Sequence, residues 1–350
     1  MAIRTIVAAL TLLVGSLALS PSAPRGEPAH PSKEKPAAGA PARPGRFVLA
    51  WGKKGDGPGE FNIPIGIALG PHGDLFVSDF YNARVQRFST AGKLLSAFPV
   101  LPNPGGIAVD RDGSVYLTHF SAMRLKEEPK PSRVTVYGPD GKLLREWGKT
   151  GTGPGEFDYP GGIAVSPAGR VYVCDQTNRR VQVFDRQGKF LFKWGRYGTG
   201  PGEFGGNINP KSRVGGPQFV ALDAAGHVFT TEGSVGRVQV FTADGKFLRA
   251  WGSNDDRPGA FGGSYRQIKG SLRGPVGICV DAGGRLWVSA VSGRVQQFTA
   301  DGKYLRGVGQ GQGSGPGQFV APHGVVTDGH GNLYVVDGHN CRVQKFDVGP

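Results

Sequence analysis

The sequence has little of what would favour helices, disulfides or a membrane span. Only two methionines occur in 350 residues, and no long amphipathic helical pattern follows the N-terminal segment. The three cysteines, Cys174, Cys279 and Cys341, are too few and too scattered for a disulfide framework, so we expect free thiols. The longest apolar run falls short of the roughly 20 residues that a transmembrane helix needs, which predicts no permanent membrane span.

Motifs for cofactors and catalytic centres are equally sparse. Gly148-Lys149-Thr150 lacks the earlier glycine of a phosphate-binding loop, and no strand-to-helix context surrounds it. Asp110-Arg111-Asp112-Gly113 begins like a calcium loop but lacks the later ligands. We therefore predict no cofactor and assign no catalytic or metal-ligating residue.

The first 44 residues have two compositions, and neither predicts part of a globular core. Residues 1–20 begin with a positive charge at Arg4, continue as an apolar run and end in small residues, which is typical of a secretory signal peptide. Residues 21–44 are rich in Pro and Ala without hydrophobic periodicity, so we expect a disordered linker. The sequence thus predicts an exported protein, periplasmic or extracellular, whose folded domain is residues 45–350.

Glycine and proline are abundant, at 59 and 27 residues, and their placement is regular. Glycines recur between short apolar runs, which indicates turns between strands rather than disorder. A proline opens a similar unit six times, at Pro64, Pro104, Pro160, Pro217, Pro275 and Pro322. Self-similar units with a shared core of about 40 residues indicate a repeat architecture.

Each unit contains four short strand patterns, here called a to d in chain order. Examples are Gly106–Val109 for a, Leu75–Ser78 for b, Arg180–Phe184 for c and Lys189–Trp194 for d. Glycine turns such as Asp112-Gly113 predict tight antiparallel hairpins between a and b and between c and d. Four antiparallel strands per unit, repeated, are typical of propeller blades.

The last unit ends after its strand c, and the missing strand d lies at the other end of the domain. Arg46–Trp51, followed by Gly52, has the same pattern as Lys189–Trp194. We expect this N-terminal strand to complete blade 6 and close the ring, which removes the exposed edges of an open array. The predicted fold class is all-β, a six-bladed β-propeller with four antiparallel strands per blade.

The repeated pattern resembles the NHL repeat. The third unit carries it as Pro-Gly-Gly-Ile-Ala-Val from Pro160, Val-Tyr-Val-Cys-Asp up to Asp175, Asn-Arg-Arg-Val-Gln-Val-Phe up to Phe184, and Phe-Leu-Phe-Lys-Trp-Gly up to Gly195. The resemblance extends from Arg46 to Asp347 and implies the propeller fold. It implies little about function, because similar propellers serve as scaffolds, RNA readers, sensor domains and enzymes.

Two repeated motifs are interpreted as structural. Gly-x-Gly-Pro-Gly-Glu-Phe, at 55–61, 151–157 and 198–204, is predicted to form loops between blades, each pinned by a buried Phe. Asp-x-x-Asn-x-Arg is complete in blades 1, 3 and 6, where the polar side chains can bond the turn. The Asp position is His119, Glu232 and Ala290 in the other blades, and such departures from a structural rule mark candidate functional positions.

The b–c and d–a connections share one face of the predicted ring, here called the top, and the two hairpins of each blade share the bottom. The long inserts, Ala122–Ser132, Arg196–Gly216 and Ser253–Gly274, are all top connections. Long loops on one face of a rigid scaffold are where binding sites usually lie. We predict a ligand-binding surface there, formed by Arg196, Tyr197, Lys211, Arg213, Arg257, Tyr265, Arg266, Lys269 and Arg273, with His119 and His323 on the same face. The alternative is that these are solvated loops without a ligand.

The formal net charge of +14 favours an anionic partner. The alternative is a basic soluble protein without such a partner. RNA reading fits the charge but conflicts with export, so nucleic acid is not expected. The prediction is a binding or scaffold propeller, acting as a monomer, that engages a protein or an anionic polymer or glycan through its top-face loops.

The runner-up hypothesis is a hydrolase or lyase with a top-face site that could use a metal. Peptide-amidating lyases are six-bladed propellers of similar repeats, and that resemblance implies zinc-binding histidines after the prolines that open strand a. Only Pro322-His323-Gly324 matches, since the other openings carry Ile65, Gly105, Gly161, Gln218 and Val276. One ligand does not make a zinc site, and the mainly Gly and apolar openings also lack the acidic cluster of lactonase propellers.

Overall fold

The computed structural model describes residues 45–121, 131–206, 215–262 and 274–349. These residues belong to one compact unit, Ala42–Pro350. The predicted signal peptide (1–20) and linker (21–44) lie outside the described residues, so both stay predictions. Within the described ranges, no helix is long and apolar enough to cross a membrane.

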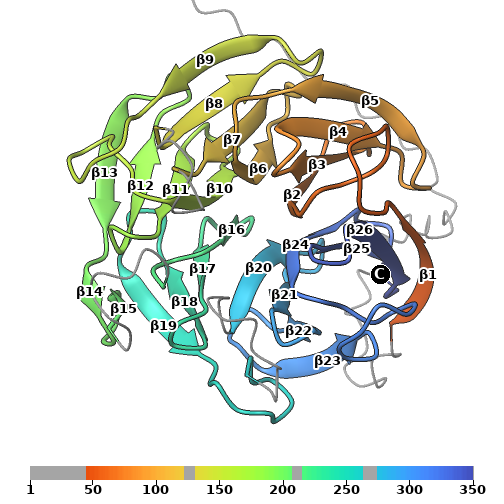
Figure 1. The fold of residues 1–350 in the computed structure, drawn as a ribbon. Coiled ribbons are helices and arrows are strands. Elements are labelled where there is room, and N and C mark those ends of the chain that lie inside the picture. The colour runs from red at the N-terminus through yellow and green to blue at the C-terminus, as the bar shows by residue number, and fades with distance from the viewer. Residues whose placement is uncertain (1–44, 122–130, 207–214, 263–273, 350) are drawn as a thin grey trace, which may run out of the picture. The chain divides into compact units, whose positions relative to one another are not determined.

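Six antiparallel sheets of four strands each surround a central axis (Figure 1). Blade 1 consists of β2 (Pro64–Leu69), β3 (Leu75–Asp79), β4 (Arg84–Phe88) and β5 (Leu94–Pro99). Blade 2 consists of β6 (Pro104–Val109), β7 (Val115–His119), β8 (Arg133–Tyr137) and β9 (Leu143–Trp147). Blade 3 consists of β10 (Pro160–Val165), β11 (Val171–Asp175), β12 (Arg180–Phe184) and β13 (Phe190–Trp194).

The remaining blades complete the ring. Blade 4 consists of β16 (Val220–Leu222), β17 (Val228–Glu232), β18 (Arg237–Phe241) and β19 (Phe247–Trp251). Blade 5 consists of β20 (Pro275–Val280), β21 (Leu286–Ala290), β22 (Arg294–Phe298) and β23 (Tyr304–Val308). Blade 6 consists of β24 (Pro322–Thr327), β25 (Asn332–Asp337), β26 (Arg342–Asp347) and β1 (Arg46–Trp51). A two-stranded parallel sheet of β14 (Tyr197–Gly198) and β15 (Phe204–Gly205), which the sequence did not predict, lies in the loop before blade 4.

Ring closure by the N-terminal strand is confirmed. β1 pairs antiparallel with β26, with Arg46 opposite Asp347 and Trp51 opposite Val343. The two ends of the propeller chain therefore lie side by side in one blade (Figure 1). The all-β, six-bladed fold class is confirmed with it.

The strands bury their residues according to their distance from the axis. The second strand of each of the first five blades, such as β3 or β11, is buried at every position, because blades cover both of its faces. The outer strands alternate, as in β13. Four outer strands end in a Trp that packs on the c–d turn glycine of the next blade. These pairs are Trp51 with Gly92, Trp147 with Gly188, Trp194 with Gly245 and Trp251 with Gly302.

Neighbouring inner strands approach one another through a glycine at the third position of strand a. A Cβ added at Gly277 would lie 2.0 Å from the backbone oxygen of His323 in the next blade, so only glycine fits there. The Ser289 hydroxyl accepts a hydrogen bond from the Gly277 N–H and donates one to that same oxygen. Ser78, Thr118 and Thr231 bridge blades 1, 2 and 4 to the next blade in the same way.

The predicted loops between blades are confirmed, with a fully buried Phe in each. These residues are Phe61, Phe157, Phe204, Phe261 and Phe319. In blade 3 the buried Arg180 donates its Nε–H to Asp175 at 2.7 Å and its terminal N–H groups to three loop carbonyls, those of Thr152, Gly153 and Glu156. The Asp-x-x-Asn-x-Arg motif is therefore structural, because it fastens each loop to the blade that follows.

A left-handed residue precedes strand c in every blade whose b–c turn is tight. It is glycine in blades 4 and 5, at Gly236 and Gly293, but Ala83, Arg179 and Cys341 in blades 1, 3 and 6. All three cysteines are free thiols, in three separate blades. Because a Cβ is strained at positive φ, the non-glycine turns store conformational energy.

Replacing Ala83 by Gly is expected to stabilise the protein. Ala83 has φ +49°, and the relief of this strain should exceed the larger entropy that glycine loses on folding, which leaves a gain of about 0.5–1 kcal/mol. Thermal and urea melts of the variant would measure it. The matched control is Gly293→Ala, which should destabilise, because its Cβ would lie 2.8 Å from Gln312 at a φ of +82°. A lower melting temperature for Ala83→Gly would contradict the argument.

Candidate functional site at the centre of the top face

The predicted basic surface is only partly described. Lys211, Arg213, Tyr265, Arg266, Lys269 and Arg273 lie outside the described residues. Arg196 pairs with Glu203 at 2.8 Å, and Arg257 pairs with Asp255 at 2.7 Å, although about four-fifths of each arginine side chain is exposed. The Tyr197 hydroxyl donates to the Gly206 carbonyl at 3.2 Å. The described members of this set thus already have partners within their own loops.

Arg196 has a structural counterpart in other blades. Lys53 pairs with Glu60 and Lys149 with Glu156 at the same loop position. The Gly200 N–H, and then Arg196, lower the pKa of Glu203 below its ordinary value, so this carboxylate stays ionised at neutral pH. The pair therefore repeats a loop contact, and it leaves Arg196 with one side of its guanidinium free for a partner.

His119 is a buried structural residue rather than an exposed ligand group. Its side chain occupies the Asp position of the motif in blade 2 and is 2% exposed. Nδ1 lies 3.1 Å from the Pro102 carbonyl and Nε2 lies 2.7 Å from the Thr135 hydroxyl. Since a carbonyl only accepts, Nδ1 carries the proton and Nε2 accepts from Thr135. Burial lowers the pKa of His119 to about 4, so the ring is neutral at physiological pH.

Acid should destabilise the fold through His119. The imidazole has a pKa of about 4 in the folded protein and about 6.5 when unfolded, so protonation favours the unfolded chain. Its contribution is complete above pH 6.5 and is lost as the pH falls toward 4, by an amount of about 3 kcal/mol. His119→Gln, which keeps both hydrogen-bonding roles without titrating, should flatten stability across this window. Equal pH profiles for both proteins, measured by urea unfolding, would sink the assignment.

An aromatic cluster lies at the centre of the top face on blades 1 to 3. Phe80 and Phe120 follow β3 and β7, Tyr159 precedes β10, and Ile65 lies in β2. The rings of Phe120 and Tyr159 stack at 4.5 Å between centroids with 19° between their planes, and Phe80 lies 5.7 Å from Phe120. Residues far apart in sequence thus form one apolar surface beside the axis.

Blade 4 lacks the glycine that the other blades have at the third position of strand a. Its opening reads Pro217-Gln218-Phe219, so Phe219 stands where the other five blades have glycine, and β16 is shortened to three residues. Phe219 packs against the aromatic cluster and also against a second cluster, formed by Val276 and Val291 of the neighbouring blade 5 and Ala321 at the opening of blade 6. A single side chain therefore contacts both halves of the ring at the top centre.

Several buried polar atoms around this centre have no hydrogen-bond partner. Gln218 is 1% exposed, and neither its amide oxygen nor its amide nitrogen has a hydrogen-bond partner among the residues that the structure describes. The same holds for one side-chain atom each of Ser121, Gln176 and His323. A Cβ added at Gly161 would lie 2.4 Å from the Gln218 backbone oxygen and 2.6 Å from Gln176 Nε2, which places the two glutamines together. An unsatisfied buried group costs roughly 1–3 kcal/mol, so a ligand that satisfies these groups would gain affinity.

His323 opens strand a of blade 6 at the same level. Burial, together with the nearby His339, lowers the pKa of His323 to about 4, so its ring is neutral at pH 7. Within the described ranges, no group of three or more His, Cys, Asp or Glu side chains is placed to hold a metal ion. His323 thus contributes a neutral donor and acceptor to the top centre.

The top-centre residues were largely missed by sequence reasoning. Phe80, Phe120, Tyr159, Gln176 and Phe219 were not candidates, and Gln218 was noted only as a strand opening. One signal was available, since Phe219 interrupts a glycine that five units share. The top-centre site is defined below as Ile65, Phe80, Phe120, Tyr159, Gln176, Gln218, Phe219 and His323.

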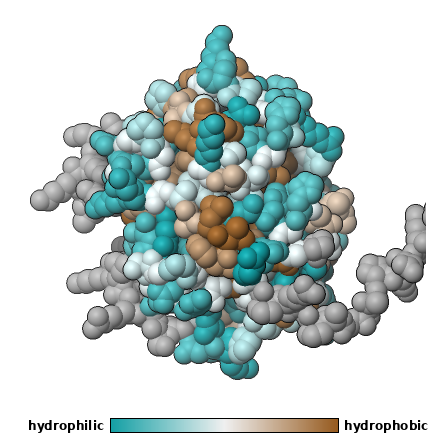
Figure 2. All heavy atoms as spheres, turned by 90° about the vertical axis from the view of Figure 1, so that its right-hand side faces the viewer, coloured by the Kyte–Doolittle hydropathy of each residue, from teal (hydrophilic) through white to brown (hydrophobic). Residues whose placement is uncertain are grey.

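Apolar side chains are exposed one at a time around the rim of the ring. Outer strands expose Val48, Leu95, Leu144, Leu191 and Leu248, each between 38% and 48%. Figure 2 shows the side that carries β1 and β5, where hydrophobic residues form separate patches among hydrophilic ones. Because these side chains are spread around the blades, the rim is a weaker candidate than the top centre.

Fold and repeats together define the class of the protein as a six-bladed β-propeller. The family model described as the NHL repeat matches residues 61–88, 157–184 and 319–346. The propeller therefore contains NHL repeats, and in this it is similar to NHL-repeat proteins. The three matched segments lie in blades 1, 3 and 6, which are the blades with a complete Asp-x-x-Asn-x-Arg motif.

Similar sequences occur in animal proteins. Human E3 ubiquitin-protein ligase TRIM32 is 24% identical over 345 residues, which cover 91% of this chain and 48% of TRIM32. The protein brain tumor of Drosophila melanogaster is 26% identical over 137 residues, which cover 37% of this chain and 12% of that protein. The chain thus spans about half the length of TRIM32.

Similar solved structures share the fold. The virginiamycin B lyase of Staphylococcus aureus matches with a TM-score of 0.52 and 16% identity, over 81% of this chain and 94% of the lyase. A gluconolactonase from Xanthomonas campestris matches with a TM-score of 0.55 and 16% identity, over 90% and 99%. At this identity the likeness extends to the propeller alone.

Proposed function

We propose that the protein is a binding scaffold outside the cytoplasm, and that its top-centre site holds a segment of a protein partner. The observation that carries the proposal is Gln218, a buried carboxamide whose donor and acceptor are both unused. A carboxamide offers one acceptor and two donors, which match the N–H and C=O of a peptide bond.

The neighbouring groups suit the same partner. Phe120 and Tyr159 stack beside the axis and provide a rigid apolar surface for a side chain of the partner. Gln176 adds a second side-chain amide, whose Nε2 lies close to the Gln218 backbone. A peptide presents apolar side chains and backbone amides together, whereas a polyanion uses mainly charge, so the top centre favours a protein partner.

Export and the role of the basic loops belong to the proposal as well. The composition of residues 1–44 supports export to the periplasm or the extracellular space. The exposed Arg196 and Arg257 support an acidic rim on the partner, or an anionic glycan beside it. A monomeric state and an absence of nucleic-acid binding stay predictions.

A lyase or hydrolase is the second candidate. The neighbouring His323 and His339 on the top face favour it, because two imidazoles could share acid and base roles. Purified protein carrying about one zinc per chain, lost with His323→Ala, would support this candidate over the scaffold.

Peptide selection tests the proposed function. Peptides selected from a displayed library on the full chain should bind at least tenfold more weakly to Gln218→Leu, a loss of about 1.4 kcal/mol. The same variant should melt at a higher temperature, since the substitution removes an unsatisfied amide from a buried position. Arg196→Ser is the matched top-face control and should keep most of the affinity. Peptide binding that depends on Arg196 and ignores Gln218 would move the site to the rim.

A further inference from the structure

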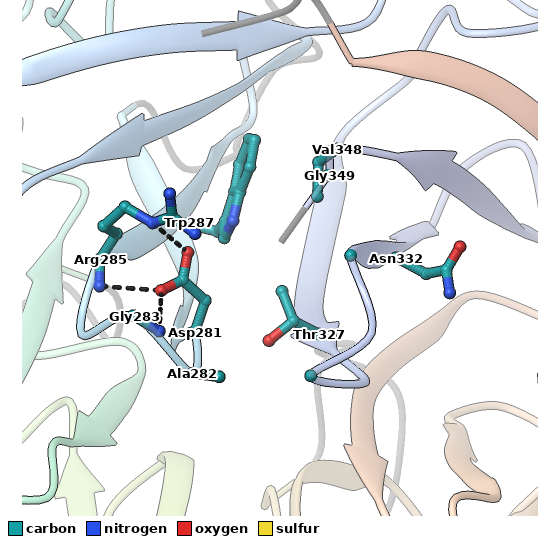
Figure 3. A pocket seen from close by; sticks show the side chains of 11 residues that line it. Asp281, Ala282, Gly283, Arg285, Trp287, Thr327, Asn332, Val348 and Gly349 are labelled. Carbon is teal, nitrogen blue, oxygen red and sulfur yellow. Dashed lines mark hydrogen bonds and ion pairs between the residues drawn. The ribbon is translucent and has the colours of Figure 1, made fainter. Parts of the chain in front are cut away.

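A cavity of about 260 Å³ lies on the bottom face between blades 5 and 6 (Figure 3). Asp281, Arg285 and Trp287 of blade 5 form one side of it, and Thr327 and Val348 of blade 6 form the other. One water needs roughly 15 Å³ of such space, so the cavity has room for a small organic molecule.

The cavity follows from the way the ring closes. At four other blade junctions, an outer-strand Trp packs on the c–d hairpin of the next blade, as Trp251 does on Gly302. Blade 6 has no such hairpin, because its strands c and d are the two ends of the propeller chain. At this junction Val308 replaces the Trp, and Val348 and Gly349 stand in place of the hairpin. Fewer side chains therefore cover the bottom face at the junction of blades 5 and 6 than at those four junctions.

The wall on blade 5 is rigid. Asp281 accepts hydrogen bonds from the backbone N–H groups of Gly283 and Arg285, from Arg285 Nε at 3.0 Å and from Gln297 Nε2 at 2.8 Å. Both oxygens of Asp281 are thus occupied, and the carboxylate is a poor acceptor for anything else.

The charge balance of this wall is positive. The Arg306 guanidinium lies 5.3 Å from the centre of the Trp287 ring and donates to the Val348 carbonyl at 2.6 Å. Arg285 and Arg306 lie close enough that each charge opposes the other, and burial and Arg285 together lower the pKa of Arg306. Two guanidinium groups therefore stand beside the single carboxylate of this wall. On the blade 6 side, Asp328 lies between the lining residues Thr327 and Gly329, and its carboxylate accepts from Asn332 Nδ2 and the Tyr334 hydroxyl.

Three side chains beside the cavity can donate hydrogen bonds to a ligand. Arg285 uses Nε on Asp281, and its side chain is 33% exposed, so its terminal N–H groups can reach a ligand. Trp287 is fully buried, and its Nε1–H has no partner within the described part of the chain. The Thr327 hydroxyl points into the space between the two walls (Figure 3). Hydrogen-bond donors on the arginine-rich wall of blade 5, backed by Trp287 and Val348, suit a negatively charged acceptor with a small apolar body.

We propose that this cavity, here called the seam cavity, binds a small organic carboxylate. The carboxylate bonds to Arg285 and Thr327, and its apolar body packs between Trp287 and Val348. The site is independent of the top-centre site, because it lies on the opposite face and shares no residue with it.

Titration calorimetry of the full chain with propionate and benzoate tests the proposal, with propionamide and benzamide as neutral controls of the same shape. Saturable binding of at least one carboxylate is expected, with no binding of its amide. Arg285→His at pH 8 should weaken binding at least tenfold, and Thr327→Val should weaken it several-fold.

Both substitutions already occur in other blades of this chain. Blade 4 has His227 on Asp223 at the place of Arg285 and Asp281, at 2.7 Å. Blades 2, 3 and 5 have Val109, Val165 and Val280 at the place of Thr327. The control is Arg170→His, the equivalent change in blade 3 outside the cavity, which should leave binding unaltered. The proposal is overturned if neither carboxylate binds, if an amide or inorganic phosphate binds more tightly, or if Arg285→His binds like the parent.

Discussion

Deletion of residues 45–51 is expected to remove most of the stability of the propeller. The deletion takes away β1, its hydrogen bonds to β26, and the packing of Phe47 and Trp51 on Phe346 and Tyr334. Truncating one buried aromatic side chain costs about 3–5 kcal/mol, and each lost hydrogen bond costs about 1 kcal/mol more. The sum approaches the 5–15 kcal/mol that holds a typical domain together. Calorimetric melting should therefore show a much lower or absent cooperative transition.

Deletion of residues 38–44 is the control for this experiment, since these residues precede the paired strand. It should leave the melting temperature unaltered. A synthetic peptide of residues 45–51, added in excess to the truncated protein, should restore part of the transition by mass action. Identical melting of the truncated and parent proteins would mean that β1 does not close the ring.

Replacing Arg180 by Ala should have the second-largest effect. Arg180 is 5% exposed, and it holds Asp175, which is fully buried, together with three loop carbonyls. Removing one partner of a buried ion pair costs about 3–5 kcal/mol, because the other charge stays buried. Burial already raises the pKa of Asp175 to about 6 against the opposing effect of Arg180. Without Arg180 the pKa of Asp175 rises further. The loss of unfolding free energy caused by Arg180→Ala should therefore become smaller as the pH falls from 8 to 5.

Blade 5 provides the matched comparison. Arg294 occupies the position of Arg180, but Ala290 replaces the aspartate, and the arginine donates only to carbonyls, at 2.8 to 3.5 Å. Removing Arg294 leaves no buried carboxylate without its partner. Arg294→Ala should therefore lower the unfolding free energy by only about 1–2 kcal/mol. Equal losses of unfolding free energy in the two variants would show that the ion pair contributes nothing beyond the loop contacts.

The blades were predictable because their determinants are local and repeated. Strand c was expected at Arg180–Phe184 in the third unit, and β12 begins and ends at these residues. Turn glycines and alternating apolar residues fix such hairpins within a few residues of sequence. Ring closure was also predictable, because Arg46–Trp51 carries the pattern that the sixth unit lacks.

The top-centre site was not predictable in the same way. Phe219 packs against two clusters from different blades because a ring brings the openings of all the blades together, and no local sequence pattern records those distances. Two structural contacts of predicted site residues could have been anticipated from the repeats. Arg196 has its partner Glu203 seven residues away, as Lys53 has Glu60, and His119 stands at a position that other blades use for structure.

The pairing of β1 with β26 also constrains how the chain can reach its native state. Arg46 and Asp347 are 301 residues apart, so this contact has nearly the longest sequence separation that the propeller allows. Blades 1 to 5 consist of consecutive segments and can form as the chain emerges during synthesis, whereas blade 6 must wait until residue 347 is available. Until then β1 has no neighbour and the first and fifth blades have open faces, which are surfaces that recruit other chains. We therefore expect closure of the ring to be a late and slow step of folding, and the unclosed chain to be the species most exposed to aggregation.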